Sequence, residues 1–184
     1  LYHLFTGLFD FFYKKKHLGN FDERVSNKIY QLKTALSVGL EIPDTIISNT
    51  LNTLKAIKHN IITKSINNPP NFIIENQLFS TFTSRIEDFT KLSETFLPSL
   101  VQNEISKLFE IRIFYIDKKF FSSAIFSQSD KQTMVDLRNY NNKKPNRVVP
   151  YLLPIPICEK IIMLFEKLNI NTGSIDMIKG CDNK

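Results

Sequence analysis

Apolar residues recur along this chain with two different periods, and each period predicts one kind of element. Leucine and phenylalanine fall every three or four positions over residues 1–17, which is the spacing of one face of a helix. The same spacing predicts a helix from Ser26 to Val38, capped by Ser26 and ended by Gly39, and another over 156–168. The expected inward faces of these two helices are Ile29, Leu32, Leu36 and Leu40 in the first, and Ile157, Ile161, Phe165 and Leu168 in the second.

Shorter runs rich in isoleucine, phenylalanine and valine predict strands, because β-branched and aromatic side chains favour extended backbone. The runs are 45–48, 60–66, 71–75, 78–84, 99–105, 109–116, 120–128, 147–153 and 173–178, with a short helix over 51–58. The runs on either side of Asn76 and Gln77 should form a hairpin, and those joined by the turn at 117–119 should form an antiparallel pair. Pro150 should keep its strand at an edge.

This mixture of helices and strands predicts an α+β fold in two successive units. We expect 1–25 to be a helix and linker left from a preceding domain, 26–97 to be the first α+β unit, and 98–184 to be the second. The turn-forming residues 180–183 would lead into a return strand that the sequence does not contain, and the first residue is not Met. We therefore expect a fragment, incomplete at its C-terminus.

The N-terminal helix has two interpretations. Its apolar face (Leu1, Leu4, Phe5, Leu8, Phe11 and Phe12) would normally pack on the protein's own core. The basic residues that follow would also suit an amphipathic helix on a membrane surface. The run is too short to span a bilayer and contains Asp10.

Composition narrows the function only slightly. The formal charge of +6 is compatible with nucleic acid, with nucleotide phosphates or with a plain solvated surface. Two isolated cysteines and three scattered histidines give no zinc-ligand spacing and fit the reducing cytoplasm. The five glycines form neither a Walker loop nor a dinucleotide fingerprint, and no Ser/His/Asp or Cys/His set stands out.

Charged residues inside the predicted strands are the remaining candidates. Lys64 ends an apolar run, and it either reaches water or meets an anion such as a phosphate. Glu110 and Arg112 lie two positions apart in one strand, so both point to one face, which is either a solvated ion-pair stripe or the floor of a ligand cleft.

A second group of charged residues follows later in the chain. Asp136 and Arg138 in the long polar segment 129–146 could form an ordinary salt bridge, or the arginine could clamp a phosphoryl group or carboxylate. Asp176 interrupts the last apolar strand, where it either faces the turn or requires a metal or another cation.

The order of these segments resembles the ATP-grasp superfamily. Lys64, "LVQNEI", "EIR", "SQSD…VDLR" and "GSIDMI" follow one another as they do in its ribosomal-protein glutamate ligases and graspetide (microviridin-type) macrocyclases. The resemblance covers nearly the whole chain from about Leu18. It implies two α+β subdomains with an ATP cleft between them. The substrate-side domain that precedes them in the family would be missing here. The segment after Lys64, "SINNPPNF", departs from the family because it lacks glycine.

The resemblance also implies an ATP site. Lys28 and Lys64 match the two lysines that face the phosphates of ATP. Asn103 and Glu104 match the hinge whose backbone meets the edge of the adenine. Glu110 matches the acidic residue near the ribose.

Three further residues match the family's reaction centre. Arg112 matches the strand arginine of the active-site face, and Arg138 matches the arginine that meets the phosphoryl group or acyl-phosphate. Asp176 matches the first ligand of Mg²⁺. The other metal ligands of the family would follow Lys184, so we expect this fragment to be inactive alone.

By this resemblance the protein is a cytoplasmic ligase that uses ATP and Mg²⁺ to form ester or amide crosslinks in a ribosomally made precursor peptide. Its partner would be that peptide, with a leader and acidic core residues, rather than nucleic acid or a membrane. Whether the enzyme acts as a homodimer is left open. The alternative function is a non-enzymatic basic module that binds nucleic acid or peptide, and a third is a membrane-surface protein led by the N-terminal helix.

Overall fold

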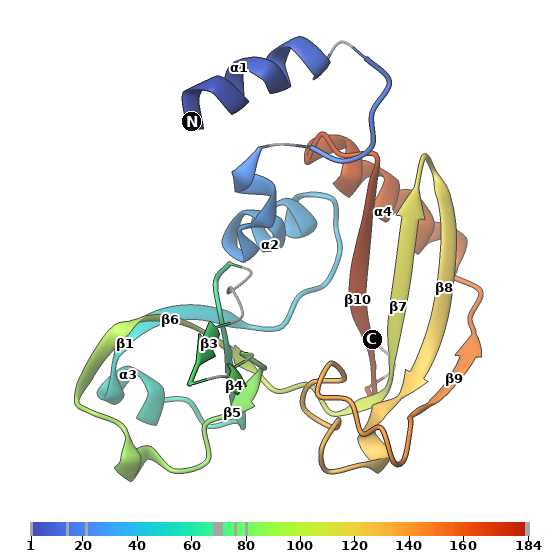
Figure 1. Ribbon diagram of the computed structural model, residues 1–184. Coiled ribbons are helices and arrows are strands. Elements are labelled where there is room, and N and C mark those ends of the chain that lie inside the picture. The colour runs from blue at the N-terminus through green and yellow to red at the C-terminus, as the bar shows by residue number, and fades with distance from the viewer. Residues whose placement is uncertain are drawn as a thin grey trace.

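The structure, a computed structural model, describes residues 2–13, 15–20, 22–67, 72–75, 77–79 and 81–182. Two four-stranded antiparallel sheets lie at opposite sides of the molecule, joined by helices and by the long segment after β8 (Figure 1). The predicted α+β class is confirmed. Because each sheet has one face covered by helices or segments, the two sheets form separate cores.

The first sheet has the strand order β1-β6-β2-β5. Its strands are β1 (Thr45–Thr50), β6 (Thr95–Asn103), β2 (Ile61–Lys64) and β5 (Ser84–Arg85). The short helix α3 (Leu51–Lys55) covers it, and the core is built on the buried side chains of Leu54, Ile61 and Val101. A 3-10 turn, η2 (Phe89–Lys91), packs Phe89 against this core.

The position of β6 corrects one expectation. We expected residues from 98 onward to belong to the second unit, but β6 lies inside the first sheet, between β1 and β2. Leu100, Val101 and Gln102 are almost fully buried there, because both neighbouring strands cover this segment. The chain therefore changes sheets after Asn103 rather than near Pro98.

The second sheet has the order β10-β7-β8-β9. Its strands are β10 (Thr172–Gly180), β7 (Lys107–Ile116), β8 (Lys119–Phe126) and β9 (Arg147–Pro150). β7 and β8 pair antiparallel through the expected turn, and the Pro150 strand lies at the edge, as predicted. The helix α4 (Ile155–Lys167) covers one face, with Ile161 and Phe165 buried against Ile113 and Tyr115. The opposite face of this sheet carries Glu110, Arg112 and Asp176.

The helix α2 (Lys28–Ser37) begins and packs differently from the prediction. Ser26 belongs to the preceding 3-10 turn η1 (Glu23–Ser26), and the side chain of Asn27 caps α2 instead. Ile29 and Leu36 are exposed, because α2 turns Thr34 and Val38 inward. Val38 packs on Leu164 and Leu168 of α4. Gly39 ends the helix as expected, with a φ of 77°.

The helix α1 (Tyr2–Tyr13) stands apart at the top of the molecule (Figure 1). Leu4, Phe5, Leu8, Phe11 and Phe12 are all exposed, so the interpretation that this face packs on the core described here is wrong. Asn169 donates a 2.7 Å hydrogen bond to the hydroxyl of Tyr13, which ties the end of α1 to the end of α4. Among the described residues, no helix combines the length and apolarity needed to cross a bilayer.

A separate hairpin, β3 (Phe72–Ile74) with β4 (Gln77–Phe79), follows β2. It confirms a hairpin here, but β4 begins at Gln77 and ends at Phe79, and Ser84, which was expected in the same strand, belongs to β5. Asn76 lies outside the described residues. The turn residue Glu75 has a positive φ of 48°.

Candidate active site

The centre of the open face of the second sheet is an ion pair between neighbouring strands. Arg112 on β7 donates two hydrogen bonds to Asp176 on β10, of 2.9 and 3.1 Å, one to each carboxylate oxygen. The two residues are direct partners in the strand register. Both side chains remain more than a third exposed, so they stay accessible to a ligand.

The long segment after β8 carries a second arginine to the same place. It starts with the 3-10 turn η3 (Ser127–Ser129), and Asp136 and Arg138 lie in its middle. The guanidinium and backbone N–H of Arg138 donate to Asp136, which is 7% exposed. The backbone N–H of Thr83 donates to the same carboxylate at 2.8 Å. Asp136 therefore connects the first part of the chain to the segment that carries Arg138.

These hydrogen bonds set the protonation state of Asp136. Burial acts to raise the pKa of this carboxyl, but the hydrogen bonds from the Arg138 side chain and the Thr83 and Arg138 backbones outweigh burial. The pKa falls to about 2. The carboxylate is therefore ionised at neutral pH and holds Arg138 in a fixed orientation.

Two lysines approach from the first half of the molecule. Lys64 is the last residue of β2 and is partly buried. Lys28 is the first residue of α2, and its backbone N–H donates to the carbonyl of Ile66 at 2.9 Å, which holds the helix start against the chain that leaves β2. Its Nζ donates to the carbonyl of Asn67 at 3.3 Å.

These cations lie close enough to one another to shift one another's pKa. Burial lowers the pKa of Lys64, and the charges of Lys28 and Arg138 lower it further, while Asp136 and Asp176 oppose them. Burial also lowers the pKa of Lys28, with a contribution from Arg138. We call Lys28, Lys64, Arg112 and Arg138 the cationic cluster. It contains four of the nine residues singled out from the sequence, and Asp176 lies near it.

Glu110 lies on the same face as Arg112, as the two-residue period predicted, and its Oε1 oxygen is already hydrogen-bonded within the protein. It accepts a 2.6 Å bond from Lys107 and a short hydrogen bond from the hydroxyl of Ser127. Both charged side chains are about nine-tenths buried. The register of β10 skips Leu108, and this bulge brings Lys107 to the face of Glu110. The expected position of Glu110 beside a ribose stays a prediction.

Asn103 and Glu104 lie where the chain passes from the first sheet to the second, as expected for a hinge. Both N–H groups are engaged: that of Asn103 donates to Asp44 and that of Glu104 to Asn60. The carboxylate of Glu104 accepts two hydrogen bonds from Arg85, of 2.7 and 2.6 Å. Because both N–H groups already donate within the protein, neither is free to bind adenine in this structure.

The described residues do not form a complete metal site. No group of three or more His, Cys, Asp or Glu side chains in the described part of the chain could hold a metal ion. Asp176 offers one carboxylate, and Arg112 is hydrogen-bonded to both of its oxygens. Mg²⁺ requires about six oxygen ligands, so these residues alone do not account for its binding.

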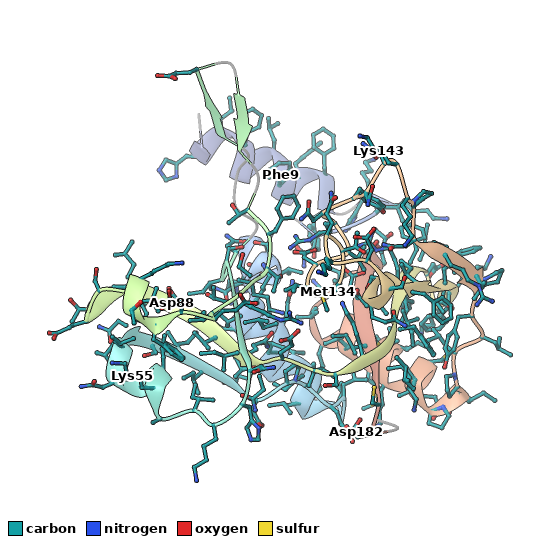
Figure 2. The ribbon with its side chains drawn as sticks, turned by 90° about the horizontal axis from the view of Figure 1, so that it is seen from below. Phe9, Lys55, Asp88, Met134, Lys143 and Asp182 are labelled. Atoms are coloured by element: carbon teal, nitrogen blue, oxygen red, sulfur yellow. The ribbon has the colours of Figure 1, made fainter. Side chains whose placement is uncertain are left out.

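An open pocket of about 350 Å³ lies beside the Asp136 connection. The segments 82–87 and 131–139 line it, so both halves of the molecule contribute. Met134, one of its lining residues, lies between the two halves when the molecule is seen from below (Figure 2). The pocket extends the site from Asp136 toward Arg85.

Sequence reasoning missed Lys107, Ser127 and Thr83. Lys107 lies an odd number of positions from Glu110, so a regular strand would place it on the opposite face. Thr83 acts through its backbone, which leaves no trace in residue type. Only the polar Ser127, directly after an apolar strand, carried a signal.

Comparison with known proteins supports the fold and its family. No protein-family model matches the sequence, and no curated protein matches it significantly. A Chryseobacterium gregarium RiPP-associated ATP-grasp ligase, in complex with ADP and a leader and core peptide, has a TM-score of 0.82 and 26% identity over 99% of this chain and 57% of that chain. The macrocyclase MdnC from Microcystis aeruginosa MRC, bound with the precursor peptide MdnA, has a TM-score of 0.70 and 30% identity over 87% and 51%.

A third structure, the ATP-grasp ligase PsnB with minimal precursor, Mg and ADP, has a TM-score of 0.62 and 15% identity over 87% and 48%, which shows the fold alone. The chain spans about half the length of these solved proteins. The chain therefore has the ATP-grasp fold. Within that superfamily it is similar to solved RiPP-associated ligases, in agreement with the order of its motifs.

Proposed function

We propose that this protein is an ATP-dependent ligase that crosslinks a ribosomally made precursor peptide. The observation that carries the proposal is that Lys28, Lys64 and Arg138, from other elements, lie near Arg112 and Asp176 on the open face of the second sheet. Asp176 and Asp136 compensate Arg112 and Arg138, but among the described residues neither Lys28 nor Lys64 forms an ion pair, so a bound anion would relieve the repulsion between these two lysines. The triphosphate of ATP is such an anion, and the similar Chryseobacterium ligase is in complex with ADP and its peptides.

The reaction that suits this site has two steps. A side-chain carboxylate of the peptide attacks the γ-phosphorus of ATP, which forms an acyl-phosphate and releases ADP. A hydroxyl or amine of the same peptide then attacks the acyl carbon and expels phosphate, and its proton passes to solvent. The result is a macrocyclic ester or amide and the net loss of one water. Charge neutralisation and positioning supply the catalysis, so no covalent nucleophile of the protein is needed.

Each member of the cationic cluster has a place in this scheme. Lys28 and Lys64 bind the phosphates of ATP. Arg138, oriented by Asp136, contacts the transferred phosphoryl group, and Arg112 contacts the carboxylate that receives it. A charged arginine fork suits both tasks, because it can donate two parallel hydrogen bonds.

Three further assignments belong to the proposal. Asn103 and Glu104 mark the adenine end of the site, and Glu110 fixes the sheet beneath the ribose end. Asp176 is the first carboxylate that would hold Mg²⁺. The metal ion would supply charge neutralisation at the phosphates. We place the reaction in the cytoplasm, since Cys158 and Cys181 are both free thiols.

Mass spectrometry of a precursor peptide tests the function. The full-length protein, ATP and a panel of acidic precursor peptides should give a product lighter by one water per crosslink. The variant Arg138→Gln should lose this product, while Lys58→Met, which changes an exposed lysine on the same half of the chain as Lys64, should keep it.

Two outcomes separate the proposal from its rivals. ATP-dependent loss of water that disappears when ATP is replaced by ADP supports the ligase. No loss of water across the whole panel, together with salt-dependent binding of an oligonucleotide, would instead indicate the basic binding module.

A further inference from the structure

The open face of the second sheet carries an aromatic pair beside the Arg112–Asp176 ion pair. Phe114 on β7 and Phe121 on β8 are direct cross-strand partners, with ring centroids 6.3 Å apart. Their exposed fractions are 44% and 61%. We call these two residues the aromatic pair.

On the opposite face of the same sheet, an aromatic side chain is buried against α4. Tyr115, one position along β7, is 3% exposed and packs on Phe165 of α4 with ring centroids 4.1 Å apart. The alternation of strand side chains therefore sends one aromatic set into the core and the other to the open face. On that open face, the neighbour of Phe114 across β10 is the small and exposed Ser174, which leaves the ring uncovered on that side.

The aromatic pair lies one step along the strand from the reaction centre. Phe114 and Arg112 are two residues apart on β7, so they share a face and lie about 7 Å apart along it. Tyr140, which is 59% exposed, lies close enough to Arg112 to influence the pKa of its guanidinium. The cations of the cluster attract carboxylates, while the rings beside them offer apolar contact.

A peptide that lies extended along β7 on this face points every second side chain toward the sheet, with the same two-residue period as the strand. If one of its carboxylates meets Arg112, the side chain two positions away along the peptide lies over Phe114 and Phe121. An intervening side chain points away from the sheet. The face thus fits an extended acidic peptide with an apolar residue at that spacing.

We propose that the aromatic pair binds an apolar side chain of the substrate peptide, two positions from the carboxylate that is activated. The pair thereby selects which carboxylate of an acidic peptide reaches Arg112. This inference rests on the proposed function and adds a sequence preference to it.

The test compares acidic peptides that differ only at the positions two before and two after the reacting residue, with Leu or Gly at each. The wild-type protein should have a KM about tenfold lower for a peptide with Leu at one of these positions, since a buried leucine side chain contributes about that factor. Phe121→Ala should abolish this difference and leave kcat for the Gly peptide unchanged. Phe121→Leu should restore part of it.

Leu97→Ala is the matched control, because Leu97 is 85% exposed on β6 of the first sheet. It should leave the preference intact. If the ratio of the KM values for the Leu and Gly peptides is the same in the wild type and in Phe121→Ala, the inference is overturned. This holds whether or not the melting temperature of Phe121→Ala is lowered.

The peptides also carry a fluorescent label, so that binding is measured without turnover. If the wild type binds the Leu peptide more tightly but never dehydrates it, the proposed function fails while the docking inference stands. If dehydration occurs with no preference between Leu and Gly, the inference fails and the function stands.

Discussion

Arg112 on β7 and Asp176 on β10 are direct register partners, and the guanidinium contacts both carboxylate oxygens. The pairing of two strands thus holds the two groups assigned to phosphoryl transfer in one orientation. Because both side chains remain partly exposed, the pair contributes little to stability and is available for ligand binding.

Replacing Arg112 should therefore affect activity far more than stability. We expect Arg112→Gln to lower kcat for peptide dehydration by about 100-fold or more, the order found when one charge-stabilising group is lost from an active site. The free energy of unfolding should change by less than about 1 kcal/mol. Product formation and urea denaturation measure the two quantities. Arg24→Gln, which removes an exposed ion pair with Asp22, is the control and should change neither.

Glu110 should behave in the opposite way. Its ion pair with Lys107 is about nine-tenths buried, so Glu110→Gln leaves a buried ammonium without a counter-charge. We expect the free energy of unfolding to fall by about 3 kcal/mol. Glu166→Gln, which breaks an exposed pair with Lys118, should leave urea denaturation nearly unchanged. Similar small effects of both substitutions would contradict the buried pair.

The burial of Glu110 also predicts how the protein would discriminate between the sugars of the proposed nucleotide. Lys107 and Ser127 hold one oxygen of this carboxylate, and the side chain is about nine-tenths buried, which leaves little of it accessible to a ribose hydroxyl. ATP and 2′-deoxy-ATP should therefore bind with affinities within about threefold of each other, a difference well under one hydrogen bond. Isothermal titration calorimetry measures both. A preference for ATP above tenfold would place Glu110 at the ribose after all.

Asp136 predicts a pH dependence with a definite sign. Its pKa in the folded protein is about 2, below the ordinary value of 3.8, so its hydrogen bonds stabilise the fold fully above pH 4. That contribution, about 2 kcal/mol, is lost as the pH falls from about 4 through 2. The stability difference between wild type and Asp136→Asn should thus be constant from pH 7 to 5 and shrink below pH 4 in urea denaturation. A constant difference down to pH 3 would be inconsistent with this shift.

Lys64 and Lys28 predict proton uptake when nucleotide binds. Burial lowers the pKa of both, and an anionic triphosphate favours their charged forms and raises these pKa values again. Binding of ATP at about pH 9 should therefore take up protons. Calorimetry in two buffers of different ionisation enthalpy measures this uptake. Lys64→Met should reduce it, whereas Lys58→Met should not.

The sequence indicated the second sheet well, because its strands alternate strongly and β7 and β8 are joined by a tight turn. The period of two placed Glu110 and Arg112 on one face, and the helical period placed Ile161 and Phe165 inward. The order of motifs then indicated the ATP-grasp fold, although no single motif was distinctive.

The parts that failed depend on contacts distant in sequence. Strand β6 was assigned to the wrong sheet, because its apolar pattern is equally compatible with either side of the hinge. The outward turn of Leu36 on α2 follows from where α4 lies, which local periodicity cannot report. Likewise, the partner of Glu110 depends on a bulge at Leu108 that has no signature in residue type.

The most direct test of the central claim is the affinity of the protein for ATP relative to adenosine, measured by calorimetry in the wild type and in Lys64→Met. If the cationic cluster binds the triphosphate, the wild type should bind ATP at least 100-fold more tightly than adenosine. Lys64→Met should weaken ATP binding by about tenfold or more and leave adenosine unaffected, as expected for the loss of one partly buried charge contact. Equal affinities for ATP in the two proteins would contradict the account.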